Sequence, residues 1–214
     1  MNKIYYLICV CFGLAACSAD LAPIEGCEAL GGIRPVCGMN PPEDIAALAD
    51  GKHLLLSNFG GMHDATGKLS LFDTETEALT TLFPPPSGTI ASSAEQWGQA
   101  NCPAPTLENF SPHGTHLHRL ADGRWRYLVV NHGGRESIEL FELTMAGNET
   151  SLAWRGCVLA AEDTYMNDVV GLANGDLIFS RMLHHGGDFE LLKATLGFVT
   201  GDLWRWNRTT GLRV

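Results

Sequence analysis

A short pattern recurs along this chain and constrains its fold more than any other feature. Residues 43–51 and 167–175 align without a gap, each with an acidic or amide pair, small apolar residues, Leu-Ala, and then Asp-Gly or Asn-Gly. Residues 120–123 repeat the second half of the pattern as Leu-Ala-Asp-Gly. Asp-Gly and Asn-Gly favour two-residue hairpin turns, because such turns need residues with positive φ. The repeat therefore predicts a chain built from hairpins.

The segments that follow these turns have the composition and alternation of β-strands. The expected strands are residues 53–58, 68–73, 79–82, 125–131, 137–142, 177–181 and 201–206. Strand, turn, strand, loop and strand, repeated with insertions, is typical of β-propeller blades, whereas a sandwich would not repeat its turn. We therefore expect an all-β propeller over residues 39–214, with about three blades in this chain. Because propellers close with four to eight blades, we expect the chain to be the front part of a longer protein or one partner of an assembled ring.

Composition excludes several classes of protein. The 214 residues are 45% hydrophobic and 18% charged, which is the balance of a globular domain and not of a disordered polymer or a coiled coil. The formal net charge is −10. An acidic surface repels phosphate groups, so we expect no nucleic-acid partner and no direct attraction to anionic lipid.

The N-terminus has the features of an export signal. A single early lysine precedes an apolar run over residues 4–12, which is too short to span a membrane. Residues 14–17, Leu-Ala-Ala-Cys, resemble the bacterial lipoprotein processing box. We expect residues 1–16 to be removed, Cys17 to be lipidated, and residues 17–38 to form an arm before the propeller. The protein would be anchored at the cell envelope, with the outer membrane favoured, or secreted if the box is an ordinary cleavage site.

Four cysteines remain for disulfides in that oxidising compartment: Cys27, Cys37, Cys102 and Cys157. They allow three pairings, and the sequence does not choose among them. None lies in a C-x-x-C arrangement, which disfavours a redox or zinc-ribbon role.

Two of the repeats carry oxygen donors at the same position, Glu43-Asp44 in one and Asn167-Asp168 in the other. We expect each pair to precede the innermost strand of its blade, so that the repetition places these side chains around one axis. Carboxylate and amide oxygens suit Ca²⁺, which takes six to eight oxygen ligands. The alternative is that both pairs are solvated turn or capping residues.

Two histidines are candidates for proton transfer. His113 lies in Ser-Pro-His-Gly, two positions ahead of the equivalent slot in the second blade, and His132 follows the strand over residues 125–131. Imidazole titrates near neutral pH and can accept a proton there. If the two rings meet at one mouth of a channel, they would form a base and its orienting partner. The spacing His113-x-x-His116-x-His118 also suggests zinc, although the rest of a zinc hydrolase motif is missing.

Several segments are similar in order and spacing to the paraoxonase/arylesterase family. They are residues 42–45 (Pro-Glu-Asp-Ile), 109–114 (Asn-Phe-Ser-Pro-His-Gly), 127–132 (Tyr-Leu-Val-Val-Asn-His) with 138–141 (Ile-Glu-Leu-Phe), and 166–169 (Met-Asn-Asp-Val). The resemblance runs from about Cys27 to the C-terminus. The Pro-His-Gly and Val-Val-Asn-His pieces are its most specific parts.

This resemblance implies a six-bladed propeller with two calcium ions on its axis. Glu43 and Asn167 would bind the catalytic ion, and Asp44 and Asp168 the structural one. His113 and His132 would form the dyad that activates water. The family's other ligands to the catalytic ion come from later blades, so the ligand cage in this chain would be incomplete and the chain alone weakly active or inactive. Cys27 would correspond to a cysteine whose partner lies in the last blade.

The implied activity is calcium-dependent hydrolysis of a small carboxylic ester or lactone. Two alternatives stay open: a non-catalytic, calcium-stabilised propeller that binds a partner at the cell envelope, and a lactonase of the gluconolactonase type. The segment over residues 84–105, rich in Pro, Ser and Gly, is either a lid or a surface loop. The physiological substrate and the oligomeric state do not follow from the sequence.

Overall fold

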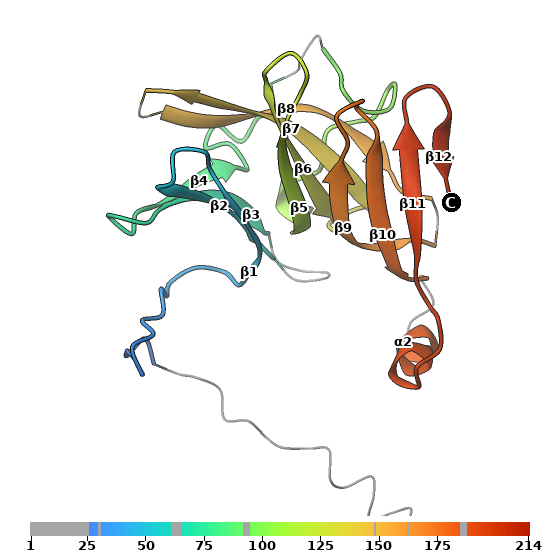
Figure 1. The fold of residues 1–214 in the computed structure, drawn as a ribbon, viewed down its shortest axis with the longest axis horizontal. Coiled ribbons are helices and arrows are strands. Elements are labelled where there is room, and N and C mark those ends of the chain that lie inside the picture. The colour runs from blue at the N-terminus through green and yellow to red at the C-terminus, as the bar shows by residue number, and fades with distance from the viewer. Residues whose placement is uncertain are drawn as a thin grey trace, which may run out of the picture. The chain divides into compact units, whose positions relative to one another are not determined.

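The computed structural model describes residues 26–29, 31–60, 66–91, 95–147, 149–161, 163–184 and 188–214 (Figure 1). The expected signal peptide and Cys17 lie outside these residues. The chain divides into two units, Met1–Cys37 and Gly38–Val214. In the N-terminal unit Cys27 is bonded to Cys37. The expectation that Cys27 pairs with a cysteine of a last blade is therefore wrong, because Cys27 forms its disulfide with Cys37, only 10 residues away.

The C-terminal unit contains three four-stranded antiparallel sheets, each with its strands in chain order, and 48% of the structure is strand. The first sheet consists of β1 (Pro42–Ala47), β2 (His53–Asn58), β3 (Lys68–Asp73) and β4 (Leu79–Phe83). The second consists of β5 (Pro112–Arg119), β6 (Trp125–Asn131), β7 (Ser137–Ala146) and β8 (Glu149–Leu159). The third consists of β9 (Tyr165–Gly171), β10 (Leu177–Leu183), β11 (Asp202–Asn207) and β12 (Gly211–Arg213). The prediction of an all-β fold is confirmed.

Within the described ranges, the helical segments are the 3₁₀ turn η2 (Leu107–Asn109) and the helix α2 (Asp188–Thr195). The sequence analysis did not predict α2. Within the residues that the structure describes, no helix has the length and apolar character needed to cross a membrane.

The repeated Asp-Gly and Asn-Gly pairs do form the turns between the first two strands of each sheet. The prediction of two-residue turns is wrong, however. In the second sheet the Leu120 N–H donates to the Arg124 carbonyl, which leaves three residues in the loop, and the first sheet has one residue more. Only the glycine has positive φ, for example 89° at Gly123. A two-residue turn would need positive φ at the aspartate or asparagine as well, whereas a longer turn ends on a single left-handed glycine.

The second sheet lies between the other two and contributes to both hydrophobic cores (Figure 1). Tyr127 and Val129 pack toward the first sheet, and Leu128 and Val130 pack toward the third. Successive side chains of a strand point to opposite faces, so a strand buried on both sides is apolar throughout. This explains the continuous run Tyr-Leu-Val-Val in β6.

The long connection between the first and second sheets is fastened to β8 over its second half. Cys102 is bonded to Cys157, and the N–H groups of Trp97 and Gln99 donate to the carbonyls of Arg155 and Cys157. Of the two interpretations of residues 84–105, the described part from residue 95 therefore supports a surface segment held against the second sheet.

Candidate functional site

The first strands of the three sheets meet at one pocket of about 310 Å³. β1 contributes Glu43 and Asp44, β5 contributes His113 and Gly114, and β9 contributes Asn167 and Asp168. The structure thus brings together the four predicted oxygen-donor residues and one of the two predicted histidines, from segments up to 125 positions apart in the sequence.

The pocket residues lie where each first strand is irregular. The pairing of β1 with β2 shifts between Pro42 and Asp44, and the pairing of β5 with β6 shifts between Pro112 and Thr115. A similar shift in the third sheet lies opposite residues 167–168. Bulges re-aim side chains that a regular strand would direct at its neighbours. The expectation that the polar pairs precede their strands is therefore wrong: they lie inside β1 and β9, at these irregular positions.

His113 is held by one hydrogen bond to its ring and one to its own main chain. Its Nδ1 lies 2.9 Å from the Asn167 carbonyl oxygen, and its own carbonyl accepts a hydrogen bond from the Ser57 hydroxyl at 2.6 Å. Because a carbonyl oxygen can only accept, Nδ1 carries the ring proton and Nε2 keeps its lone pair. Nε2 lies 3.5 Å from a carboxylate oxygen of Glu43, so the basic nitrogen is on the pocket side of the ring.

Gly114 allows β5 and β9 to approach this closely. A Cβ atom at position 114 would lie 2.3 Å from the Asn167 carbonyl oxygen and 2.7 Å from Cα of Asp168. Both are backbone atoms, so any larger residue would push β9 away from β5. The glycine of the Pro-His-Gly segment therefore keeps the carbonyl that orients His113 within hydrogen-bonding distance.

The carboxylates of the two aspartates of the pocket accept hydrogen bonds from the protein. One carboxylate oxygen of Asp44 accepts from both the N–H and the hydroxyl of Thr115, each at 2.7 Å, and the other accepts from the N–H of Ile45. Asp168 accepts from the N–H of Val169 at 2.8 Å. The Asp44 bonds join β1 to β5, so this carboxylate fixes the spacing of two strands that line the pocket.

His132 lies beside His113 but outside the lining of the pocket. The two ring centroids are 5.0 Å apart, with an angle of 65° between the ring planes. The ring of Tyr165 stacks on His132 at 4.8 Å, and Nδ1 of His132 lies 2.7 Å from a carboxylate oxygen of Glu136. The predicted proximity of the two histidines is present. However, the acceptor on His113 Nδ1 is the Asn167 carbonyl and not His132.

The oxygen donors of the pocket are of the kind that calcium binds, but they are fewer than the six to eight ligands that calcium takes. Across the described ranges, no group of three or more His, Cys, Asp or Glu side chains is arranged to hold a metal ion. Glu43 and Asn167 nevertheless offer a carboxylate and an amide oxygen in a space with room for water, and calcium accepts all three kinds of ligand. Glu43 keeps 38% of its side chain exposed, so its oxygens are open to a ligand.

The suggested zinc pattern instead forms part of the packing between β5 and β9. His116 and His118 stack at 5.1 Å. Nδ1 of His116 accepts from the N–H of Gly171, and Nε2 of His118 accepts from the side chain of Arg126. Each ring uses an acceptor nitrogen for a protein donor, which requires the neutral form. These histidines therefore have a structural role in the described structure.

The folded state is expected to lose stability in mild acid through His118. Burial and the neighbouring Arg126 lower the pKa of His118 from 6.5 to about 4. Between these values the unfolded chain binds a proton that the folded chain excludes, so stability falls as the pH drops from 6.5 to 4. Thermal unfolding followed across this range should show a shallower pH dependence for His118→Gln than for the wild type. Equal slopes would contradict this role.

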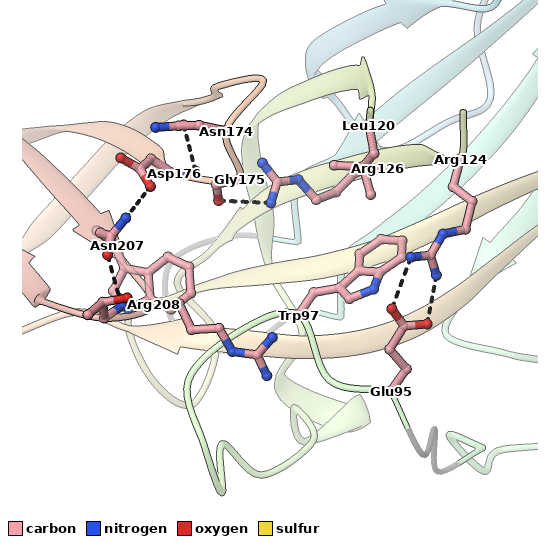
Figure 2. Close-up of a pocket in the computed structure, with 12 residues that line it drawn as sticks. Glu95, Trp97, Leu120, Arg124, Arg126, Asn174, Gly175, Asp176, Asn207 and Arg208 are labelled. Carbon is pink, nitrogen blue, oxygen red and sulfur yellow. Dashed lines mark hydrogen bonds and ion pairs between the residues drawn. The ribbon is translucent and has the colours of Figure 1, made fainter. Parts of the chain in front are cut away.

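A second pocket, of about 350 Å³, lies at the other end of β5 and β9 (Figure 2). Arg124 pairs there with Glu95 and packs over the ring of Trp97 at 5.0 Å. Asp176 accepts from Arg205 and Asn207. The sequence analysis missed this cluster, although it lies beside two of the repeated turns. Because its carboxylates are matched by arginines, we interpret it as a polar seam between the second and third sheets.

Comparisons with known proteins add no assignment. No protein-family model matches the chain, and no curated protein matches it either. The functional interpretation therefore depends on the residues and geometry of the pocket between β1, β5 and β9.

Proposed function

We propose that this chain is a calcium-dependent hydrolase of carboxylic esters or lactones, of paraoxonase type. The observation that carries the proposal is the convergence of a carboxylate, an amide and an imidazole at one pocket, with Nε2 of His113 facing Glu43 at 3.5 Å. An oxygen-rich cation site next to a basic nitrogen is the arrangement that metal-assisted hydrolysis of an acyl group needs.

The proposal includes a β-propeller as the scaffold. Three sheets with their strands in chain order, packed against one another and with their first strands around a common pocket, are what successive blades would provide. The resemblance of the sequence to the paraoxonase family suggests six blades in the complete ring. The expected lipid anchor at Cys17 would place this activity at the cell envelope.

Glu43 and Asn167 would hold the catalytic calcium ion, with water or further protein oxygens completing its ligands. Asp44 and Asp168, whose carboxylates are already fixed by backbone donors, would support a second, structural ion. When bound, calcium would polarise the substrate carbonyl and stabilise the negative charge that develops on its oxygen.

His113 would act as the general base. Its Nδ1 proton is committed to the Asn167 carbonyl, so Nε2 is the atom that takes a proton from the attacking water. Glu43 at 3.5 Å would stabilise the imidazolium formed in this step. His132 would hold the ring of His113 in place through their edge-to-face contact. The proton would then return to the leaving alkoxide.

The proposal is tested by calcium removal. Weak hydrolysis of phenyl acetate and of a long-chain lactone is expected in excess Ca²⁺, because this chain holds only part of the expected ligand cage. The activity should fall to background in EDTA and return when Ca²⁺ but not Mg²⁺ is restored. Mg²⁺ is the matched control, because its rigid octahedral preference suits this mixed donor set poorly.

Thermal unfolding with and without Ca²⁺ separates the possible outcomes. A chain that is stabilised by Ca²⁺ but hydrolyses neither substrate would support a non-catalytic, calcium-stabilised binding module. A chain whose stability and hydrolysis both ignore Ca²⁺ would contradict the calcium site itself.

A further inference from the structure

Glu136 connects the second histidine to the strand that lines the pocket. It lies in the loop between β6 and β7, four residues after His132. One carboxylate oxygen is 2.7 Å from Nδ1 of His132, and the other accepts a longer hydrogen bond, 3.3 Å, from the N–H of Met166. The side chain of His132 is buried, with 2% exposed, and that of Glu136 is largely covered, with 11% exposed.

This contact selects one tautomer of His132. An ionised carboxylate has no proton to donate, so Nδ1 of His132 must carry the proton of the hydrogen bond. In the neutral ring, Nε2 is then the only nitrogen with a free lone pair. A carboxylate that holds the proton of one ring nitrogen fixes both the tautomer and the orientation of an imidazole, as it does in catalytic triads.

Two aromatic rings fix the remaining freedom of His132. Tyr165 stacks nearly parallel to it, at an interplanar angle of 13°, and Phe59 meets it edge-on at 89°. Phe59 also packs against His113 at 5.6 Å, so both histidines share one aromatic support. With the plane of the ring set by packing, Glu136 determines which nitrogen is protonated.

We propose that Glu136 is a positioning residue that holds His132 in the Nδ1–H form and, through His132, holds the ring of His113. The set His113, His132 and Glu136 then extends the histidine pair to three members. The kinetic consequence rests on the hydrolase function proposed above, whereas the tautomer itself does not.

The tautomer is tested by long-range ¹H–¹⁵N correlation spectra of the histidine side chains. The wild type should show His132 as the Nδ1–H tautomer. Glu136→Gln should change that signature, because glutamine has a single acceptor oxygen for the two N–H groups of His132 and Met166. Glu142→Gln is the matched control, since Glu142 pairs with Arg155 on the same sheet away from His132, and it should leave the His132 signals unchanged.

Either of two results would overturn the proposal: a wild-type His132 in the Nε2–H form, or identical His132 signals in the wild type and Glu136→Gln. The tautomer of wild-type His132 is measured without any variant, so this test remains valid even if Glu136→Gln does not fold. Both readings are independent of activity and of calcium.

In the kinetic arm, Glu136→Gln should lower kcat about 10-fold with little change in KM, while Glu136→Asp, which keeps the carboxylate, should recover part of the loss. An active wild type with an unaffected Glu136→Gln would reject the role of Glu136 alone. An inactive wild type would reject the hydrolase function and leave the spectroscopic result to decide the tautomer.

Discussion

Replacing His113 with glutamine is expected to lower kcat/KM for phenyl acetate by about 100-fold or more, which is the usual range for loss of a general base. Glutamine is close in length and can still donate to the Asn167 carbonyl, so the contact between β5 and β9 is retained. It offers no basic nitrogen to the pocket. The loss should therefore appear in activity and not in the thermal unfolding temperature.

His116→Gln is the matched control for this prediction. It is the same substitution in the same strand, and glutamine can replace the imidazole as acceptor for the N–H of Gly171. Its activity should remain within a few-fold of the wild type. If His113→Gln hydrolysed phenyl acetate as fast as His116→Gln, His113 would not be the base, and the hydrogen-bonded pair of His132 and Glu136 would be the next candidate.

Removing the Cys102–Cys157 disulfide is expected to lower the free energy of unfolding by about 4 kcal/mol. The bond closes a loop with a sequence separation of 55 residues. Without it the unfolded chain has more conformational entropy, which stabilises the unfolded state relative to the folded one. Cys157 is fully buried in the core between the first two sheets. Alanine is therefore the better replacement at both positions, because serine would bury a hydroxyl group. The measurement is urea unfolding of the Cys102→Ala/Cys157→Ala variant.

The other disulfide provides the comparison. Cys27 and Cys37 are only 10 residues apart and belong to the separate N-terminal unit. Their removal should leave the unfolding of the three sheets nearly unchanged. Equal destabilisation by the two double variants would show that the N-terminal unit contributes to the stability of the sheets.

Much of the fold could be predicted because the local signals agree with the final structure. The strands over residues 53–58, 68–73 and 125–131 were expected within their observed bounds, since alternation and flanking turns define them. Disulfide pairing could not be predicted, because it depends on how the connection to β5 folds back on β8. The helix α2 was missed because it lies in an insertion with no counterpart in the repeats.

The candidate site was predictable where it belongs to the repeats. Glu43, Asp44, Asn167 and Asp168 occupy equivalent positions in two repeats, and the structure brings all four to one pocket. Glu136 gave no such signal, because it lies in a loop of variable length and its partner on β9 is a backbone N–H. The role of the Asn167 carbonyl in orienting His113 could not be predicted either, because every residue has a main-chain carbonyl and the sequence does not indicate which one will accept this hydrogen bond.

The segment fastened along β8 also bears on how this protein avoids aggregation. With 11 residues, β8 is the longest of the described strands, and it lies at the edge of its sheet. The open side of an edge strand is a template for pairing with another chain. The outermost strands β4 and β12 have only five and three residues. Residues 97–99 occupy backbone acceptors of β8 that a neighbouring molecule would otherwise use. The connection between β4 and β5 therefore also covers part of the exposed edge of β8, where another chain could otherwise pair.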